Sequence, residues 1–489
     1  RTHIFNDYPF LPAYNKFIID EAHHLEDTAA HHYGLSLDNI TMQYTLNQIG
    51  RIDDQKLLRQ IIGKYPQLAD HLSFDDWDQL IEDTKYEIDE LFQFLYGFVQ
   101  ERKQKDKSLS DVGRIQYRFN REDLEVATWE AIMDILDRII YFYRDLIHFL
   151  SLVDSILEKM EDYNVNDKQE LYRLMEHLQQ HIDHLELFFR PDEGIQHVEW
   201  IEVDTRGTGQ AIYLYSEPTS VSTLLKQDLF EKKDSVILTS ATLTMKNSFR
   251  YIAERIGLSE DEIITKQINS PFSFKDQVQL LVPNDFPDIK YVHTDDFDYA
   301  TSEAILSLAE VTDGRMLVLF TSYDMLRKCY KLLKEIMNGD DYMLIGQGIT
   351  SGSRSRLKKN FQSYERSILL GTSSFWEGVD IPGEDLSCLM IVRLPFQPPH
   401  HPVYEAKAKE LKEQGKNAFM EVSLPNAVIK FKQGFGRLIR SANDRGIVFI
   451  WHARIIKARY GRYFTDSIPA VPIHYDSAQN LFKKAKEWF

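Results

Sequence analysis

The chain has 489 residues, enough for about three domains of ordinary size, and 43% of them are apolar, which excludes a disordered or fibrous protein. Its formal net charge of −18 disfavours nonspecific adhesion to nucleic acid, although a net value leaves room for a basic groove on one face. Two cysteines, Cys329 and Cys388, are too few for a disulfide framework or for the four thiolates of an iron–sulfur cluster.

The apolar runs of the chain, such as residues 235–243 and 315–320, are too short to cross a bilayer. No charged segment followed by an apolar stretch opens the sequence as a targeting leader would. We therefore expect a soluble, cytoplasmic protein that has no membrane partner.

The first predicted element is a strand at residues 17–19, Phe-Ile-Ile, which is followed at once by Asp-Glu-Ala-His at 20–23. Ligand sites of α/β proteins lie at the carboxyl ends of such strands. One carboxylate here suits Mg²⁺, and its neighbour suits the polarisation of a water molecule, as nucleotide hydrolysis requires. By itself the motif equally indicates a strand end before an acidic helix N-terminus.

A helical block is predicted from about residue 26 to residue 190, where the strand signal vanishes. Its longest helix has apolar residues at alternating steps of four and three, which is typical of a buried helical seam. These are Ile132, Leu136, Ile139, Tyr143, Leu146, Leu150, Val153 and Leu157. A second seam contains Leu171, Leu174, Leu178 and Leu185. We predict that the two helices form an antiparallel pair, and such stripes indicate core packing more often than a cofactor site.

Strand signals return after this block. Residues 197–215 alternate apolar and polar side chains around a glycine-containing turn, which predicts a hairpin. Residues 234–240 predict a second buried strand. Short apolar runs then alternate with helical patterns to the end of the chain, which indicates an α/β fold with a parallel sheet.

Four later segments, taken with Asp-Glu-Ala-His, form a specific set. They are "TSATL" at 239–243, "GTSSFWEGVDIPG" at 371–383, "RLPFQPP" at 393–399 and "QGFGRLIR" at 433–440. In this order the chain resembles superfamily 2 helicases of the XPD/DinG branch, and most closely the bacterial DinG family. Residues 424–446, "LPNAVIKFKQGFGRLIRSANDRG", extend the resemblance furthest.

The resemblance implies two RecA-like lobes, of which the first is incomplete here, with an inserted, mostly helical domain like the arch of that branch. Residues 1–25 would hold motif II of the first lobe, and 216–285 the rest of that lobe with motif III. Residues 26–215 would form the insertion, which ends in the hairpin. Residues 286–489 would form the second lobe with motifs V and VI.

The resemblance also implies roles at the acidic motif. Asp20 should hold Mg²⁺ and Glu21 should orient or deprotonate the attacking water, while His23 should link the nucleotide to the second lobe. Ser240 and Thr242 should bond between this acidic site and the nucleic acid, although in isolation their segment equally indicates capping of a strand end.

The resemblance implies catalytic roles at motif VI as well. Gln433, Arg437 and Arg440 stand at i, i+4 and i+7, which predicts one face of a helix. Paired guanidiniums that can reach the transferring phosphate suit the stabilisation of transition-state charge. A surface helix with solvated arginines is the alternative.

Motif V is expected to contact both ligands. Gly371 and Thr372 would meet a nucleic-acid phosphate, and Glu377 and Asp380 would face the nucleotide or the arginine pair.

Two tempting patterns have ordinary explanations. The histidines at 23, 24, 31 and 32 with Asp27, and the pair His177 and His181, lie at helical spacing but form no closed ligand set for a transition metal. Phe375, Trp376 and Phe396 can stack on bases, but core packing is at least as good an interpretation.

No Gly-x-x-x-x-Gly-Lys-Ser/Thr motif occurs in the sequence, so the loop that holds the nucleotide phosphates is expected in an upstream segment of the same polypeptide. The chain is thus interpreted as the C-terminal motor part of a DinG-like helicase of the iron–sulfur-free type. With ATP and Mg²⁺ it would move 5′→3′ on single-stranded DNA. The alternatives are the helicase-like body of a 3′→5′ exonuclease whose nuclease lies upstream, and an ATP-independent clamp on single-stranded DNA.

Overall fold

A computed structural model describes residues 14–105, 110–111, 114–160, 163–191, 196–204, 210–286, 294–337, 341–376, 381 and 385–489. These residues fall into two compact units. The first unit contains Leu25–Leu225 and Pro399–Glu410, and the second contains Tyr14–His24, Lys226–Pro398 and Leu411–Phe489. Among the described residues, no helix combines the length and the apolar character that a membrane span needs.

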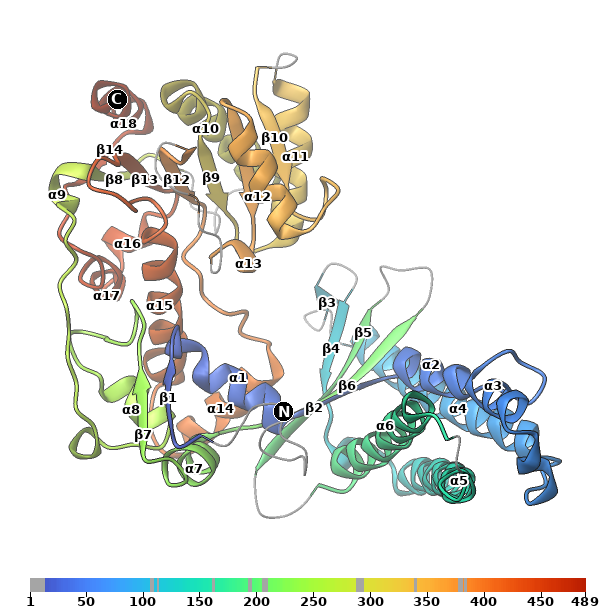
Figure 1. Cartoon of the computed structure of the whole chain (residues 1–489). Coiled ribbons are helices and arrows are strands. Elements are labelled where there is room, and N and C mark those ends of the chain that lie inside the picture. Colours follow the sequence, from blue (N-terminus) through green and yellow to red (C-terminus); the bar gives the residue numbers. More distant parts are fainter. Residues whose placement is uncertain are drawn as a thin grey trace. The chain divides into compact units, whose positions relative to one another are not determined.

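A seven-stranded sheet forms the centre of the second unit (Figure 1). Its strand order is β10-β11-β9-β12-β13-β8-β14, and every neighbouring pair is parallel. The strands are β8 (Val278–Pro283), β9 (Met316–Leu319), β10 (Met343–Gly346), β11 (Ser367–Gly371), β12 (Cys388–Ile391), β13 (Gly446–Ile450) and β14 (Ile473–Asp476). The predicted α/β class is confirmed.

Helices cover both faces of this sheet, which explains why its strands are apolar runs without alternation. One face packs on α10 (Thr294–Thr312), α11 (Tyr323–Ile336) and α18 (Ala478–Trp488). The other face packs on α12 (Arg354–Ser363), α13 (Ser373–Trp376), α15 (Leu424–Phe435), α16 (Arg454–Lys457) and α17 (Gly461–Thr465). The strand β8 was expected in the first lobe, because the predicted boundary between the two lobes was residue 285. In the structure β8 pairs with β13 and β14 in the seven-stranded sheet.

A separate pair of parallel strands carries motifs II and III in the same unit. These strands are β1 (Lys16–Ile19) and β7 (Ser235–Leu238), and Ile18 stands opposite Ile237. Apolar parallel strands of this kind are normally covered on both faces, but here Ile18 is 67% exposed and Ile237 is 51% exposed. Apolar side chains that are open to this extent mark a face that suits a partner. Two short helices, α8 (Arg250–Arg255) and α9 (Phe274–Gln277), follow before the larger sheet begins.

The first unit is built on an antiparallel sheet of five strands in the order β2-β6-β5-β4-β3. They are β2 (Leu35–Asp38), β3 (Ser110–Asp111), β4 (Arg114–Arg118), β5 (His197–Asp204) and β6 (Ala211–Pro218). The predicted hairpin is confirmed as β5 and β6. The expectation that strands are absent between 26 and 190 was wrong, because β2, β3 and β4 lie there. The strands β2 and β4 pair with β6 and β5, which lie far away in the sequence.

Helices make up the rest of this unit. They are α1 (Leu25–Tyr33), α2 (Asn39–Ile49), α3 (Leu57–Lys64), α4 (Trp77–Lys105), α5 (Val126–Leu157), α6 (Val165–Phe189), α7 (Ser222–Leu225) and the first part of α14 (Pro402–Glu413). The predicted seams of α5 and α6 are buried in one core. The two helices are antiparallel, because Arg190 at the end of α6 pairs with Asp137 near the start of α5, and Tyr143 contacts His181 midway.

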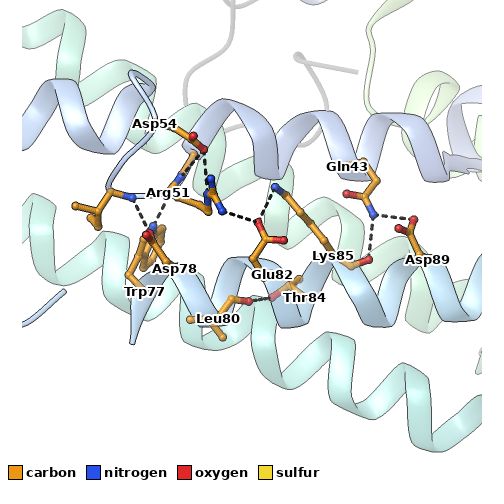
Figure 2. Close-up of polar contacts among 12 residues, drawn as sticks. Gln43, Arg51, Asp54, Trp77, Asp78, Leu80, Glu82, Thr84, Lys85 and Asp89 are labelled. Carbon is orange, nitrogen blue, oxygen red and sulfur yellow. Dashed lines mark hydrogen bonds and ion pairs between the residues drawn. The ribbon is translucent and has the colours of Figure 1, made fainter. Parts of the chain in front are cut away.

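Polar contacts fix α2 and the turn after it against α4 (Figure 2). Gly50 ends α2 with a φ of 77°, and its carbonyl accepts a hydrogen bond of 3.0 Å from the Trp77 indole. The Asp78 carboxylate accepts from the amide of Ile52 at 2.6 Å. Further along, the Gln43 amide donates to the Asp89 carboxylate at 2.9 Å. The long helix α4 is therefore held at both ends of its contact with α2.

Truncation of the α5 seam should destabilise the first unit. Leu146 is fully buried, so Leu146→Ala should lower the free energy of unfolding by about 2–5 kcal/mol through reduced burial and a residual cavity. Leu152→Ala is the matched control, because Leu152 is 38% exposed on the same helix. Urea unfolding followed by far-UV circular dichroism measures both, and equal midpoints for the two variants would contradict the burial argument.

Candidate active site

Asp20 follows β1 and lies beside the end of β7. Its Oδ1 accepts hydrogen bonds from the Thr239 hydroxyl at 2.6 Å and from the Glu21 amide at 2.9 Å. The bond from Thr239, helped by that from the amide, lowers the pKa of Asp20 below its usual range. The side chain is thus an ionised carboxylate at neutral pH, which is the ligand type that Mg²⁺ prefers.

Glu21 has a left-handed backbone with a φ of 50°, a conformation that costs a residue with a Cβ roughly 1–2 kcal/mol. The turn leads from β1 into a short 3-10 helix, Ala22–His24, whose last amide bonds to the Glu21 carbonyl at 3.0 Å. The Glu21 side chain is 66% exposed, and its Oε2 accepts from the Ser240 hydroxyl at 3.3 Å. Strain of this kind clusters at functional sites, and here it directs an open carboxylate toward motif III.

His23 is the buried centre of the site. Its side chain is 6% exposed, and burial, together with the charge of the neighbouring His24, lowers its pKa to about 4. The ring is therefore neutral at pH 7. Nδ1 lies 2.7 Å from the Ser240 hydroxyl, and Nε2 contacts the side-chain amide nitrogen of Gln433 on α15.

These contacts form one continuous hydrogen-bonded chain. With the Gln433 amide donating to Nε2 of His23, the ring proton lies on Nδ1 and is donated to Ser240, whose own proton goes to Glu21. The chain joins the end of β1 to a helix of the larger sheet. Of the predicted site residues, the structure brings these four together with Asp20.

Thr242 belongs to the same loop but is only 3% exposed. Its amide donates to the Ser240 hydroxyl at 3.2 Å, so the segment caps itself as well as bridging to motif II. The nucleic-acid contacts expected of Ser240 and Thr242 stay predictions.

The arginines of motif VI lie beyond the end of α15, and the expectation of one continuous helix face was wrong. The helix ends at Phe435, and Arg437 enters a turn in which its guanidinium donates to the Trp376 carbonyl at 3.3 Å. The Arg440 amide donates to the Asp444 carboxylate at 2.7 Å. Burial opposes ionisation of Asp444, but its hydrogen bonds from the Ser441 side chain and from two amides lower its pKa. A polar turn therefore positions Arg440, where a helix had been expected.

Motif V begins at the end of β11. A Cβ on Gly371 would lie 2.6 Å from the Cβ of Phe375, which explains the glycine. The amide and the hydroxyl of Thr372 both donate to Oε1 of Gln347, at 2.8 Å and 3.0 Å. Glu377 and Asp380 lie outside the described residues.

The aromatic residues of this region are packed inside the second unit. Phe375 is fully buried and Trp376 is 2% exposed, so stacking on bases is the wrong interpretation for these two side chains. Phe396 is partly buried and stacks on Phe419 with ring centroids 5.4 Å apart.

Sequence reasoning missed two side chains that position site residues. Thr239 lies in motif III, where no role was predicted for it, and it stands level with Asp20 because Ile19 pairs with Leu238. Gln347 follows β10, and no sequence motif distinguished it. Among the residues that the structure describes, no group of three or more His, Cys, Asp or Glu side chains could hold a metal ion.

Comparison with known proteins identifies a family model and several relatives of this chain. Residues 305–471 match the family described as Helicase C-terminal domain. The chain is 38% identical over 471 residues to 3'-5' exonuclease DinG of Bacillus subtilis (strain 168), which covers 95% of this chain and 50% of that protein. It is 28% identical over 463 residues to ATP-dependent DNA helicase YoaA of Haemophilus influenzae, which covers 94% of this chain and 63% of that protein. The chain therefore spans about half the length of the DinG proteins that it matches.

Two solved structures share the fold. The structure called "XPD_APO" superposes with a TM-score of 0.51 at 14% identity, over 97% of this chain and 80% of that one. The structure of S. tokodaii Xpd4 has the same TM-score at 15% identity, over 96% of this chain and 78% of that one. At these identities the likeness concerns the fold alone.

The neutral state of His23 predicts a pH dependence. Its folded pKa of about 4 lies below the ordinary value of 6.5, so between these values the unfolded chain binds more protons than the folded chain. The contribution of His23 to stability should therefore be complete above pH 6.5 and should fall as the pH drops toward 4. Proton NMR titration of the ring, assigned with His23→Gln, measures the pKa, and a midpoint near 6.5 would contradict the buried neutral ring.

Proposed function

Because the chain is a DinG-like member of the XPD/DinG branch of superfamily 2, we propose that it is the C-terminal motor part of an ATP-dependent DNA helicase. In the longer protein it would couple ATP hydrolysis to 5′→3′ movement along single-stranded DNA. The hydrogen-bonded chain from Glu21 through Ser240 and His23 to Gln433 carries the proposal, because it links a carboxylate suited to hydrolysis with the larger sheet.

The roles of the acidic residues follow from their environments. Bound Mg²⁺–ATP supplies the phosphoryl group and the developing charge on which these side chains act. Asp20, ionised and held by Thr239, would ligate the cation. Glu21, with its open carboxylate, would orient the attacking water and accept its proton.

The coupling would run through the hydroxyl of Ser240. Protonation of Glu21 removes the charge that accepts the Ser240 hydrogen bond, and a charged acceptor holds such a bond more strongly than a neutral one. A weakened bond at Ser240 alters the contact of that hydroxyl with His23, and His23 contacts Gln433. Arg437 and Arg440 would stabilise the charge on the transferring phosphate.

We infer that an upstream segment of the same polypeptide completes this site. The sequence has no glycine-rich phosphate loop with its lysine, and the chain spans about half of the DinG relatives. The exposed faces of Ile18 and Ile237 on β1 and β7 offer an apolar surface for that segment.

Single-stranded DNA is the proposed polymer. Thr372 and the neighbouring Gly371 would contact a backbone phosphate, which would replace Gln347 as the acceptor of the Thr372 amide and hydroxyl hydrogen bonds. Ser240 and Thr242 would connect the acidic site to the strand. No iron–sulfur cluster is proposed, because Cys329 and Cys388 are both buried and burial raises the pKa of each thiol to about 12.

A second candidate function is supported by the printed name of the 38%-identical relative, which is an exonuclease. The longer protein would then be a 3′→5′ exonuclease whose nuclease lies upstream and whose body is this chain. DNA degradation by the longer protein in the absence of ATP separates this candidate from a helicase alone.

Substitutions in the longer protein test the motor assignment. Glu21→Gln should reduce DNA-stimulated ATP turnover by on the order of a hundredfold or more while ATP still binds, as expected for loss of a general base. Arg440→Ala should reduce the turnover number by roughly a thousandfold, because it removes a group that stabilises transition-state charge.

Glu254→Gln is the control for these variants, because Glu254 is an exposed glutamate of α8 whose partner is Arg250. If Glu21→Gln and Arg440→Ala hydrolyse ATP as fast as the control, the roles given to motifs II and VI are wrong. Tight DNA binding without any ATP turnover in the unsubstituted protein would instead identify an ATP-independent clamp.

The upstream segment should also be required for catalysis. This chain by itself should show no measurable ATPase, because without a loop of amides and a lysine nothing grips the β and γ phosphates. Co-expression with the upstream segment should restore turnover and reduce light scattering, since the exposed strand faces would be covered. A turnover number for the chain alone that equals that of the complemented protein would refute the inference.

A further inference from the structure

A cavity of about 780 Å³ is formed by residues of the first unit, whereas the residues of the proposed hydrolysis site belong to the second unit. It lies between the residues that follow β4, the beginning of α5 and the end of α6. The elements β5 and α14 each contribute one side chain to its wall. None of these residues has a role in the proposed motor. The chemistry of the cavity therefore needs its own explanation.

Aromatic side chains line the cavity. Phe119 stacks on Phe188 with ring centroids 5.3 Å apart, and Phe189 lies edge-on to Phe188 at 4.9 Å. These three rings are at most 5% exposed and form a rigid apolar wall. Trp129 lies 6.4 Å from Phe119 and is only partly buried, so its indole presents surface to the cavity.

Cations and one exposed carboxylate line the rim, namely Arg121, Arg190, Lys409 and Glu122. The Arg121 guanidinium lies 5.0 Å from the centre of the Trp129 ring, and Lys409 on α14 is exposed at the cavity. Neither cation forms an ion pair with any residue that the structure describes, whereas Arg190, also at the rim, is engaged by Asp137 at 2.7 Å.

The remaining wall contains a carboxyl group. Burial raises the pKa of Glu199, and its Oε1 accepts a hydrogen bond of 3.4 Å from the Ser216 hydroxyl. A buried carboxyl repels phosphate but accepts hydrogen bonds from the amino and imino groups of a nucleobase. The interior of the cavity, with its aromatic rings and carboxyl group, therefore suits a base. The cations at its rim suit a phosphate.

We propose that this cavity binds a nucleotide of single-stranded DNA, with the base on the Trp129 face and the adjacent phosphate between Arg121 and Lys409. Aromatic faces and planar guanidiniums stack on any base, so such a site needs no sequence preference. The proposal rests on the proposed function, which supplies the strand, and adds a contact in the inserted unit that is separate from motifs III and V. The cavity would hold the strand while the motor contacts change.

The test measures binding of a fluorescein-labelled oligothymidylate to the full chain by fluorescence anisotropy at several salt concentrations. Trp129→Ala should weaken binding by roughly fivefold to a hundredfold, the range for removal of one stacked base, and Trp129→Phe should recover most of it. Tyr141→Ala is the matched control, because Tyr141 is an aromatic residue on the same helix that is 62% exposed. It should bind as the unsubstituted chain does.

The rim is tested separately. The double variant Arg121→Gln/Lys409→Gln should reduce the slope of log affinity against log salt by about 0.7, because the one phosphate proposed between these cations is no longer neutralised. Arg144→Gln is the control, because Arg144 is an exposed cation of the same unit that already faces Glu186.

Photocross-linking of an oligonucleotide that contains 5-iododeoxyuridine should label peptides from residues 119–133. Far-UV circular dichroism confirms that each variant is folded.

The outcomes separate the two proposals. If the unsubstituted chain binds DNA but the cavity variants match their controls and the cross-links lie elsewhere, the cavity proposal is overturned and the motor proposal stands. If the variants bind DNA normally but no longer bind an acidic, tyrosine-containing peptide, the occupant is a peptide and the cavity proposal is again overturned. If the unsubstituted chain and the complemented protein bind no single-stranded DNA, the proposed function fails, and the cavity proposal fails with it.

Discussion

The parallel pairing of β1 with β7 is the constraint on which the candidate site depends. It places Asp20 beside Thr239, although 219 residues separate them in the chain. Because Ile19 stands opposite Leu238, the loops that follow the two strands emerge at the same edge, and only then can Ser240 reach both Glu21 and His23. A shift of this register by one residue would turn the side chains to the opposite face and separate the site.

Burial of one neutral histidine turns this edge into a connection with the larger sheet. A charged His23 would donate from both ring nitrogens and could not accept from Gln433, so desolvation, by lowering its pKa, preserves the donor and acceptor pattern of the chain. The left-handed turn at Glu21 serves the same arrangement, because it leads the chain away from β1 while leaving the carboxylate open. Local strain and local desolvation thus maintain one polar network.

The first unit is a folded body with its own core. Its helices and its antiparallel sheet share one hydrophobic cluster, and polar contacts at the end of α2 hold α4 in place. A residue range from far along the chain, Pro399–Glu410, belongs to it as well, and there Val403 and Ala406 pack on Trp200. Through this segment Lys409 reaches the aromatic cavity, so the candidate strand contact requires parts of the chain that are far apart in sequence.

The sequence by itself determined the α/β class, the antiparallel helices α5 and α6, the β5–β6 hairpin and the motif residues, because periodicity and motif spacing are local properties. Only the tertiary structure decided the strands β2 and β4, the place of β8 in the larger sheet and the end of α15 at Phe435. It also showed Thr239 and Gln347 as partners of site residues, and Trp376 as core. These features depend on pairing and burial between distant segments, and a single sequence does not record which strands become neighbours or which turns are fixed by contacts such as that of Asp444 with Arg440.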